Sequence, residues 1–131
     1  MVKLINPSRL SSPVGFSHVA EAAGWVWLGG QIGADASGRV ENPADIAVQF
    51  ALAIRNVATA LEAAGCQPEN VVKLTYYVTD VAAYRAALKP IGQSYREVFG
   101  RHFPASSLFE VKGLFDAEAM IEIECVAFRE S

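Results

Sequence analysis

The segment AEAMIEIECVAF, residues 117–128, alternates between two kinds of side chain and is the feature that most constrains the fold. Successive side chains of a β-strand point to opposite faces of a sheet, so the alternation predicts a strand over 118–128. One face collects residues suited to a packed core: Ile121, Ile123 and Cys125. Glu122 and Glu124 point to the other face, where their neighbours are large apolar groups. The fold must therefore contain a sheet whose second face combines charge with apolar surface.

The rest of the sequence predicts the element order β-β-α-β-α-β-β. Besides the last strand, strands are expected at 16–21 and 25–30 around a turn at Ala23-Gly24, at 71–79 and near 106–112. An apolar stripe predicts a helix over 43–64 that begins at an Asn42 cap and ends before Gly65. A second helical segment follows Asp80, and we expect Pro90 to divide it into two short helices, the second starting at Pro90.

This element order indicates an α+β fold, in which a mixed sheet carries two helices on one face. A length of 131 residues predicts one domain over 1–131 with a single core that needs no disulfide or metal. The helices leave the other face of the sheet open. Because the hydrophobic share, 52%, exceeds the usual globular value, we expect a second copy of the chain to cover that face.

Charge and composition exclude several functions. The net charge is −3 and the 11 basic residues are scattered, so nucleic-acid binding is not expected. No continuous apolar run reaches the length of a membrane span and the first residues lack the core of a signal peptide, which predicts a cytoplasmic protein without membrane contact. Cys66, Cys125, His18 and His102 have no metal-ligand spacing, so no metal site is expected.

Few residues remain as candidates for chemistry. Ser106 and Ser107 lack the G-x-S-x-G motif of a serine nucleophile, and GGQIG at 29–33 matches neither of the common glycine-rich phosphate motifs. The glycines are more typical of a bulge or of a close backbone approach. Glu122 is either a solvated residue on the open face or a carboxylate that a cleft desolvates, where it would suit general-base catalysis. The residue pattern alone leaves both interpretations open.

Seven segments, in order, resemble the RidA/YjgF family of reactive-intermediate deaminases: VGFSHV, WLGGQIG, FALAIRNVATALEAAG, VVKLTYYVTD, YREVFG, HFPASSLFEV and IEIECVAF. The resemblance covers nearly the whole chain. It implies a chorismate-mutase-like subunit of the Bacillus type, assembled as a homotrimer whose sheets form a central barrel, with a cleft between neighbouring subunits. It also implies hydrolysis of enamines and imines to 2-keto acids and ammonia, without metal or organic cofactor.

The resemblance assigns site roles by position. The glutamate of the I-E-I-E motif, which positions the attacking water, corresponds to Glu122. Other positions correspond to the part of the intersubunit cleft that binds the small-molecule substrate: Phe16, Gly29, Gly30, Ser106, Ser107, Leu108 and Phe109.

Several of these positions depart from the family pattern. Ser106 stands where the P-A-R-S motif has the arginine that holds a substrate carboxylate, and Leu108 replaces a frequent cysteine. Phe16 and Gly29 replace a tyrosine and a serine, and an asparagine of the second helical segment is lost within 88–93. An ionised Glu122 with no cation beside it would repel an anionic substrate. The sequence therefore predicts a neutral or cationic imine as substrate, and inefficient hydrolysis of 2-aminoacrylate-type acids.

Two other functions remain as alternatives. The chain could be a small-molecule-binding or interaction module that uses the intersubunit cleft without chemistry. Ribonuclease activity, an older description of some relatives, is disfavoured by the acidic charge balance and the missing basic track.

Overall fold

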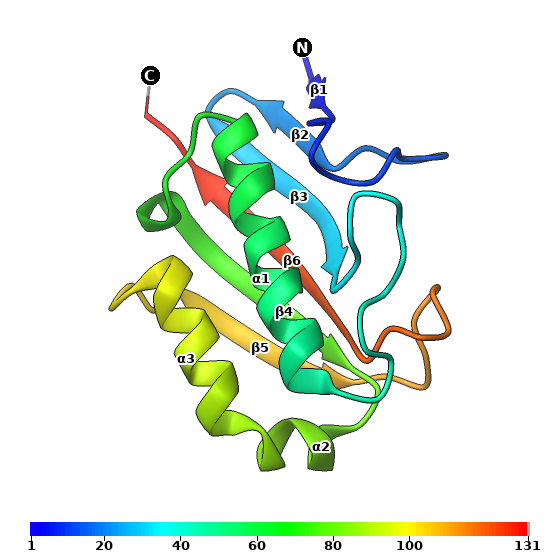
Figure 1. Ribbon diagram of the computed structural model, residues 1–131. Coiled ribbons are helices and arrows are strands. Elements are labelled where there is room, and N and C mark those ends of the chain that lie inside the picture. The colour runs from blue at the N-terminus through cyan, green and yellow to red at the C-terminus, as the bar shows by residue number, and fades with distance from the viewer. Residues whose placement is uncertain (131) are drawn as a thin grey trace.

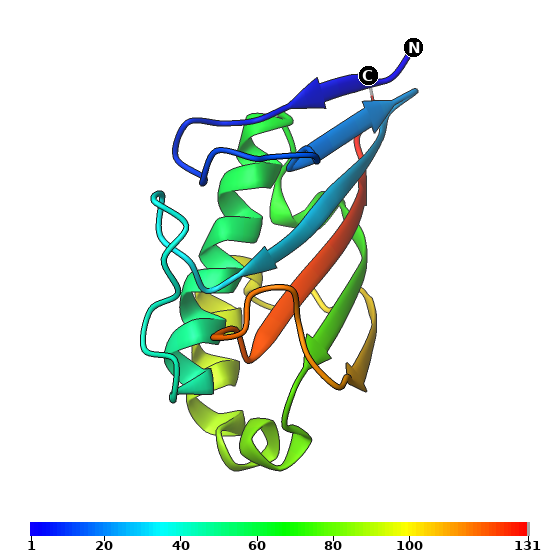
Figure 2. The same cartoon turned by 90° about the vertical axis from the view of Figure 1, so that its right-hand side faces the viewer.

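The computed structural model describes residues 1–130, which form one six-stranded sheet with helices against a single face (Figure 1). The strands are β1 (Lys3–Ile5), β2 (Val19–Ala22), β3 (Trp25–Ile32), β4 (Val71–Val78), β5 (Ala105–Glu110) and β6 (Ile121–Phe128). The helices are α1 (Ile46–Ala63), a short 3-10 helix η1 (Pro68–Asn70), α2 (Val81–Ala86) and α3 (Leu88–Phe99). Figure 2, turned by 90°, shows the helices on one side of the sheet and no helix on the other.

The strand order is β1-β2-β3-β6-β4-β5, with β4 and β5 parallel and every other pair antiparallel. Helices α2 and α3 lie in the crossover between the two parallel strands, as a parallel pair requires. The predicted α+β class and the mixed sheet with helices on one face are confirmed. Strand β1 was not predicted, because three residues are too few to show a period.

The β2–β3 hairpin turns at Ala23 and Gly24, as predicted, and both residues have positive φ, 52° and 87°. Positive φ at two central residues matches the twist of the flanking strands. Strand β2 begins at Val19, later than the predicted start at 16. The reason lies in the pairing of His18, whose backbone N–H donates to the Asn6 side chain at 2.8 Å, so residues 16–18 belong to a loop.

Helix α1 begins later than predicted. Asn42 has φ 47°, a left-handed conformation outside the helix, and the cap is Asp45, whose carboxylate accepts from two backbone N–H groups of the first turn. The predicted stop at Gly65 is confirmed by its φ of 72°. By length and composition α1 is long and apolar enough to cross a membrane, but its apolar stripe packs on the sheet as a core helix does.

The second helical segment is divided, as predicted, but at Ala87 and not at Lys89. Asp80 caps α2 by accepting from the Ala83 N–H at 3.0 Å. Pro90 is the third residue of α3 and not the first. The first turn of a helix has no intrahelical partner for its N–H groups, so proline is tolerated there.

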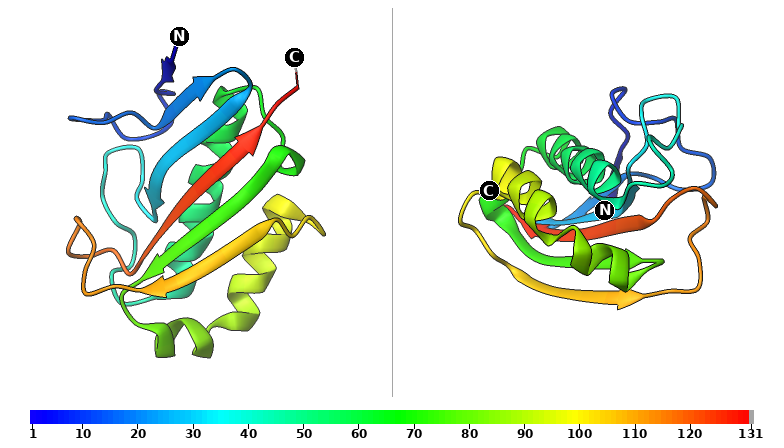
Figure 3. Two further views of the ribbon diagram at one scale, coloured as in Figure 1. Left: turned by 180° about the vertical axis from the view of Figure 1, so that it is seen from behind. Right: turned by 60° about the horizontal axis from the view of Figure 1, so that its bottom comes forward.

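The two faces of β6 differ as its alternation predicts. Ile121 and Ile123 are fully buried beneath the helices. The opposite face, seen from behind in Figure 3, is not covered by any helix. We call it the open face, and on it Trp25 and Trp27 of β3 remain 41% and 45% exposed beside Phe128 and Val126 of β6. This much exposed aromatic surface is typical of an interface.

Gln49 of α1 fixes the chain that leads into β6. Its side chain is fully buried, donates to the backbone carbonyls of Asn42 and Glu118 at 3.2 and 3.1 Å, and accepts from the Met120 N–H at 2.7 Å. These three bonds hold the entry of β6, and so the position of Glu122, against the main helix.

Candidate active site

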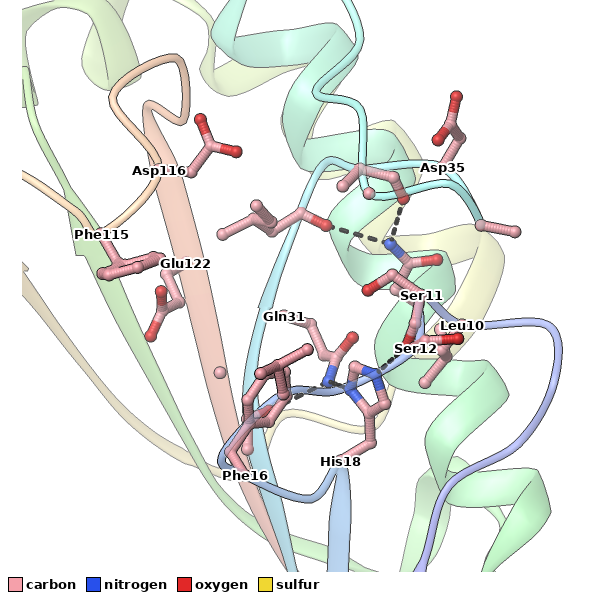
Figure 4. Close-up of a pocket in the computed structure, with 18 of the residues that line it drawn as sticks. Leu10, Ser11, Ser12, Phe16, His18, Gln31, Asp35, Phe115, Asp116 and Glu122 are labelled. Carbon is pink, nitrogen blue, oxygen red and sulfur yellow. Dashed lines mark hydrogen bonds between the residues drawn. The ribbon is translucent and has the colours of Figure 1, made fainter.

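A cavity of about 900 Å³ lies beside β3 and β6, under the loop that precedes β2 (Figure 4). We call it the Glu122 cavity. Four residues predicted for the site line it together: Phe16, Gly29, Gly30 and Glu122. Two further carboxylates, Asp35 and Asp116, line the same space, and among residues 1–130 no lysine or arginine does. The cavity is therefore acidic.

Glu122 is partly buried, and its carboxylate lies directly against Gly30. A Cβ atom placed at Gly30 would come within 2.5 Å of the Glu122 carboxyl carbon and within 2.7 Å of its Cγ, and closer still to one carboxylate oxygen. Any side chain at position 30 would occupy this space. The register of β3 against β6 shifts between Leu28 and Gln31, which is the bulge expected from the glycine pair.

The surroundings of Glu122 change its acidity. Burial raises the pKa of the Glu122 carboxyl above its ordinary value, and the charge of Glu124 on the same face of β6 adds to the increase. A carboxyl with a raised pKa holds a proton more tightly than a solvated one. Such a group is suited to accept a proton from water and to return it.

Two polar residues that sequence analysis did not single out form the floor of the Glu122 cavity. Gln31 Nε2 lies 3.0 Å from His18 Nδ1 and 3.2 Å from the Gly29 carbonyl, so the amide donates to both. His18 Nε2 then carries the proton and donates to the Ser11 carbonyl at 2.7 Å. Phe16 packs edge-on against the His18 ring, at 5.3 Å between centroids. This network holds Phe16 and the glycine backbone in place, and the glutamine within GGQIG was its only sequence signal.

The residues predicted on β5 do not reach the Glu122 cavity of the same chain. Ser107 and Phe109 lie on the open face. There Ser107 Oγ accepts a hydrogen bond from Lys73 Nζ at 2.9 Å, and the Phe109 ring stacks on Tyr77 with 6.2 Å between ring centroids. Leu108 packs against the core on the helix side. Ser106, opposite the buried Leu74, lines a second cavity between β4, β5 and the helices. Within a single chain, the predicted site residues on β5 thus lie apart from the four that line the Glu122 cavity.

The cysteines and possible metal ligands add no further site. Cys66 and Cys125 are buried and free, and burial raises the pKa of the Cys125 thiol to about 12. Among residues 1–130, no group of three or more His, Cys, Asp or Glu side chains is arranged to hold a metal ion.

The chain is similar to known proteins over nearly its whole length. The family profile described as Endoribonuclease L-PSP matches residues 7–129. A RutC family protein of Synechocystis sp. is 31% identical over 128 residues, covering 96% of this chain and 95% of the relative. The human 2-iminobutanoate/2-iminopropanoate deaminase is 28% identical, over 97% of this chain and 90% of the relative.

A solved structure shares the fold. The crystal structure of E. coli TdcF with bound serine superposes with a TM-score of 0.83 at 27% identity, and the match covers 98% of this chain and 99% of the other. The agreement extends over the sheet and the helices alike.

Proposed function

Because this chain belongs to the Endoribonuclease L-PSP family, which includes the RidA/YjgF and RutC proteins, we propose that it hydrolyses the C=N bond of a small imine or of the enamine that tautomerises to it. The products are a carbonyl compound and ammonia. The observation that carries the proposal is the Glu122 carboxylate, partly buried in a cavity with the Gly29-Gly30 backbone and the Phe16 ring. The human relative named as an imine deaminase supports the reaction class.

In the proposed reaction Glu122 handles the protons. Its carboxylate accepts a proton from water as the oxygen bonds to the carbon of the protonated imine and the C=N π electrons move to nitrogen, which gives a neutral tetrahedral carbinolamine. Glu122 returns that proton to the nitrogen. The C–N bond then breaks, ammonia leaves, and the hydroxyl proton passes to the Glu122 carboxylate as the C=O bond forms. One water is consumed for each ammonia released. The raised pKa of Glu122 favours both transfers, because the group is then a stronger base and is still able to give the proton back.

The acidic lining of the Glu122 cavity favours the nitrogen end of the substrate. Asp35, Asp116 and Glu122 stabilise a protonated imine, which is the form that water attacks most readily. The same charges disfavour a phosphate backbone, so the proposal does not include RNA cleavage despite the description of the family.

We propose that the chain assembles as a homotrimer in which the Glu122 cavity of one copy meets strand β5 of the next. The exposed apolar groups of the open face support assembly. The free edge of the sheet at β5 supports a junction there. Such a junction is also the simplest way to unite Glu122 with Ser106, since the two line separate cavities within one chain. Sedimentation measurements that find a monomer at assay concentrations would contradict this arrangement.

A coupled assay tests the reaction. A pyridoxal-phosphate dehydratase acting on threonine generates 2-iminobutanoate in the presence of the wild type, Glu122→Gln or Glu69→Gln, and ammonia release above the spontaneous rate is followed. Glu69 is an exposed glutamate on η1, outside the cavities described above, and serves as the matched control. We expect Glu122→Gln to lose about 100-fold or more in rate and the control to retain it.

Two results would change the assignment. An unaltered rate in Glu122→Gln would remove the catalytic role of this carboxylate. A wild type that binds the keto-acid product but releases no ammonia from the imine would favour the alternative of a binding module.

A further inference from the structure

A second cavity, of about 300 Å³, lies between β4, β5 and the helices α2 and α3. We call it the Arg96 cavity. Five of its eleven lining residues are aromatic, and the lining includes Ser106, the position at which the family resemblance expects an arginine. The lining residues are Phe50, Tyr76, Tyr84, Leu88, Ile91, Gly92, Tyr95, Arg96, Phe103, Pro104 and Ser106. Arg96 is the only lysine or arginine among these residues. The cavity lined by Ser106 of β5 therefore contains a cation, which comes from α3.

The Arg96 side chain folds back along α3 across Gly92, one turn earlier. A Cβ at Gly92 would lie 3.3 Å from a guanidinium nitrogen of Arg96, closer than most contacts of a real Cβ. Gly92 falls within the segment 88–93, in which the family pattern has an asparagine that this sequence lacks. The missing side chain at position 92 thus leaves the space that the guanidinium uses.

The charge of Arg96 is not neutralised within the described part of the chain. The ion pairs found in residues 1–130 are Arg9 with Glu62 and Arg129 with Glu21. Arg96 therefore retains its guanidinium donors for a ligand, in the planar arrangement that matches a carboxylate.

The aromatic residues of the Arg96 cavity pack on one another and supply further donors. The Tyr95 ring stacks between Phe99 and Phe103, with ring centroids 5.0 and 5.7 Å apart. Its hydroxyl donates to the His102 carbonyl at 2.7 Å. Burial raises the pKa of Tyr76 and of Tyr84, so both phenols keep their protons at neutral pH and remain donors. In residues 1–130 neither of these two hydroxyls has a hydrogen-bond partner.

We infer that Arg96 binds the acid group of the substrate from α3, in place of the arginine that the family motif carries at the position of Ser106. The inference rests on the proposed imine hydrolysis and adds a substrate-binding residue to its site. A cavity of about 300 Å³ is at the small end of the range for ligand sites, which suits a short acid. Arg96 thus acts as a specificity-determining residue, since it contacts the substrate away from the reacting bond.

The two cavities then have complementary charges. The acidic Glu122 cavity receives the imine nitrogen, and the Arg96 cavity of the neighbouring copy receives the acid group. The expectation of a neutral substrate depended on the absence of a cation near Ser106, and Arg96 removes that premise.

Binding of the stable product tests the inference independently of turnover. Wild type, Arg96→Ala and Arg85→Ala are titrated with 2-oxobutanoate and with its uncharged isostere 2-oxobutanamide, using calorimetry. Arg85 is an exposed arginine on α2 outside the cavity and is the matched control. We expect Arg96→Ala to bind 2-oxobutanoate about 10- to 100-fold more weakly and the amide as the wild type does, because only the acid uses the charged bonds. Arg85→Ala should behave as wild type with both.

A double variant tests whether position 106 reaches the same ligand group. Arg96→Ala combined with Ser106→Arg returns a guanidinium to the cavity from β5, and we expect it to recover most of the affinity for 2-oxobutanoate. Far-UV circular dichroism and sedimentation confirm that each variant is folded and assembled as the wild type is.

The outcomes separate this inference from the proposed function. Wild type that does not bind 2-oxobutanoate, an Arg96→Ala variant that binds it as well as wild type, or an equal loss in Arg85→Ala would each overturn the role of Arg96. Loss of keto-acid binding in Arg96→Ala, together with unchanged ammonia release in Glu122→Gln, would uphold Arg96 and refute the hydrolytic mechanism.

Discussion

Replacement of Gly30 by alanine is the sharpest test of the proposed site, because it displaces Glu122 without altering any titratable group. The added Cβ would lie 2.5 Å from the Glu122 carboxyl carbon, whereas ordinary carbon–carbon contacts are about 3.5–4.0 Å. The carboxylate must therefore retreat by about 1–1.5 Å. A misplacement of about 1 Å can lower a catalytic rate by about 100-fold, and we expect a loss of this size in kcat.

The assay is ammonia release from 2-iminobutanoate, with Gly113→Ala as the control. No heavy atom lies within 4 Å of a Cβ placed at Gly113, so the same chemical change there should be silent. Gly30 has no positive φ that alanine would strain, and the strand should accept the substitution in its backbone. A Gly30→Ala variant within about threefold of the wild-type rate would refute the reasoning that this glycine makes room for a working carboxylate.

Three further predictions follow from the same geometry. Gln49→Leu leaves three partly buried backbone groups without this partner and removes a fully buried amide, so urea denaturation should show a loss of about 2–3 kcal/mol in the free energy of unfolding, and a loss below about 1 kcal/mol would contradict the role of this side chain. Because the folded state raises the pKa of Glu122, protonation of this group favours folding; its contribution to stability is present at low pH and lost as the pH rises through the raised pKa. Between the ordinary glutamate pKa and the raised pKa of Glu122, the free energy of unfolding of the wild type should fall relative to that of Glu122→Gln. Over the same pH interval kcat/KM of the wild type should rise, because the carboxylate form is the base. A pH profile of kcat/KM with the pKa of an ordinary glutamate would contradict the raised pKa. Trp27→Glu puts a charge on the open face, and sedimentation should then find monomers that retain wild-type circular dichroism, whereas intact trimers would show that this face is not the interface.

The sequence alone was sufficient for the elements and for the class of fold. Strict alternation over 121–128 identified both faces of β6, and the β2–β3 turn followed from Ala23-Gly24. These features are readable because a strand or a helix repeats with a fixed period and because turns depend on a few residues. The start of α1 was predicted wrongly for a related reason. Asn42 and Asp45 are both good caps by residue type, and the backbone conformation at Asn42 excluded it.

Only the tertiary structure decided which of the candidate residues face the same space. The alternation assigns Glu122 to a face, but its position against Gly30 depends on the bulge between β3 and β6, two strands about ninety residues apart in sequence. The parallel pairing of β4 with β5 turns Ser106 toward the helices, and the packing of α3 brings Arg96 to the same cavity. Contacts of this kind depend on long-range register and helix packing, which no local period encodes. The resemblance to the family drew attention to position 106 from the sequence, whereas the place of Arg96 in the same cavity became visible only in the fold.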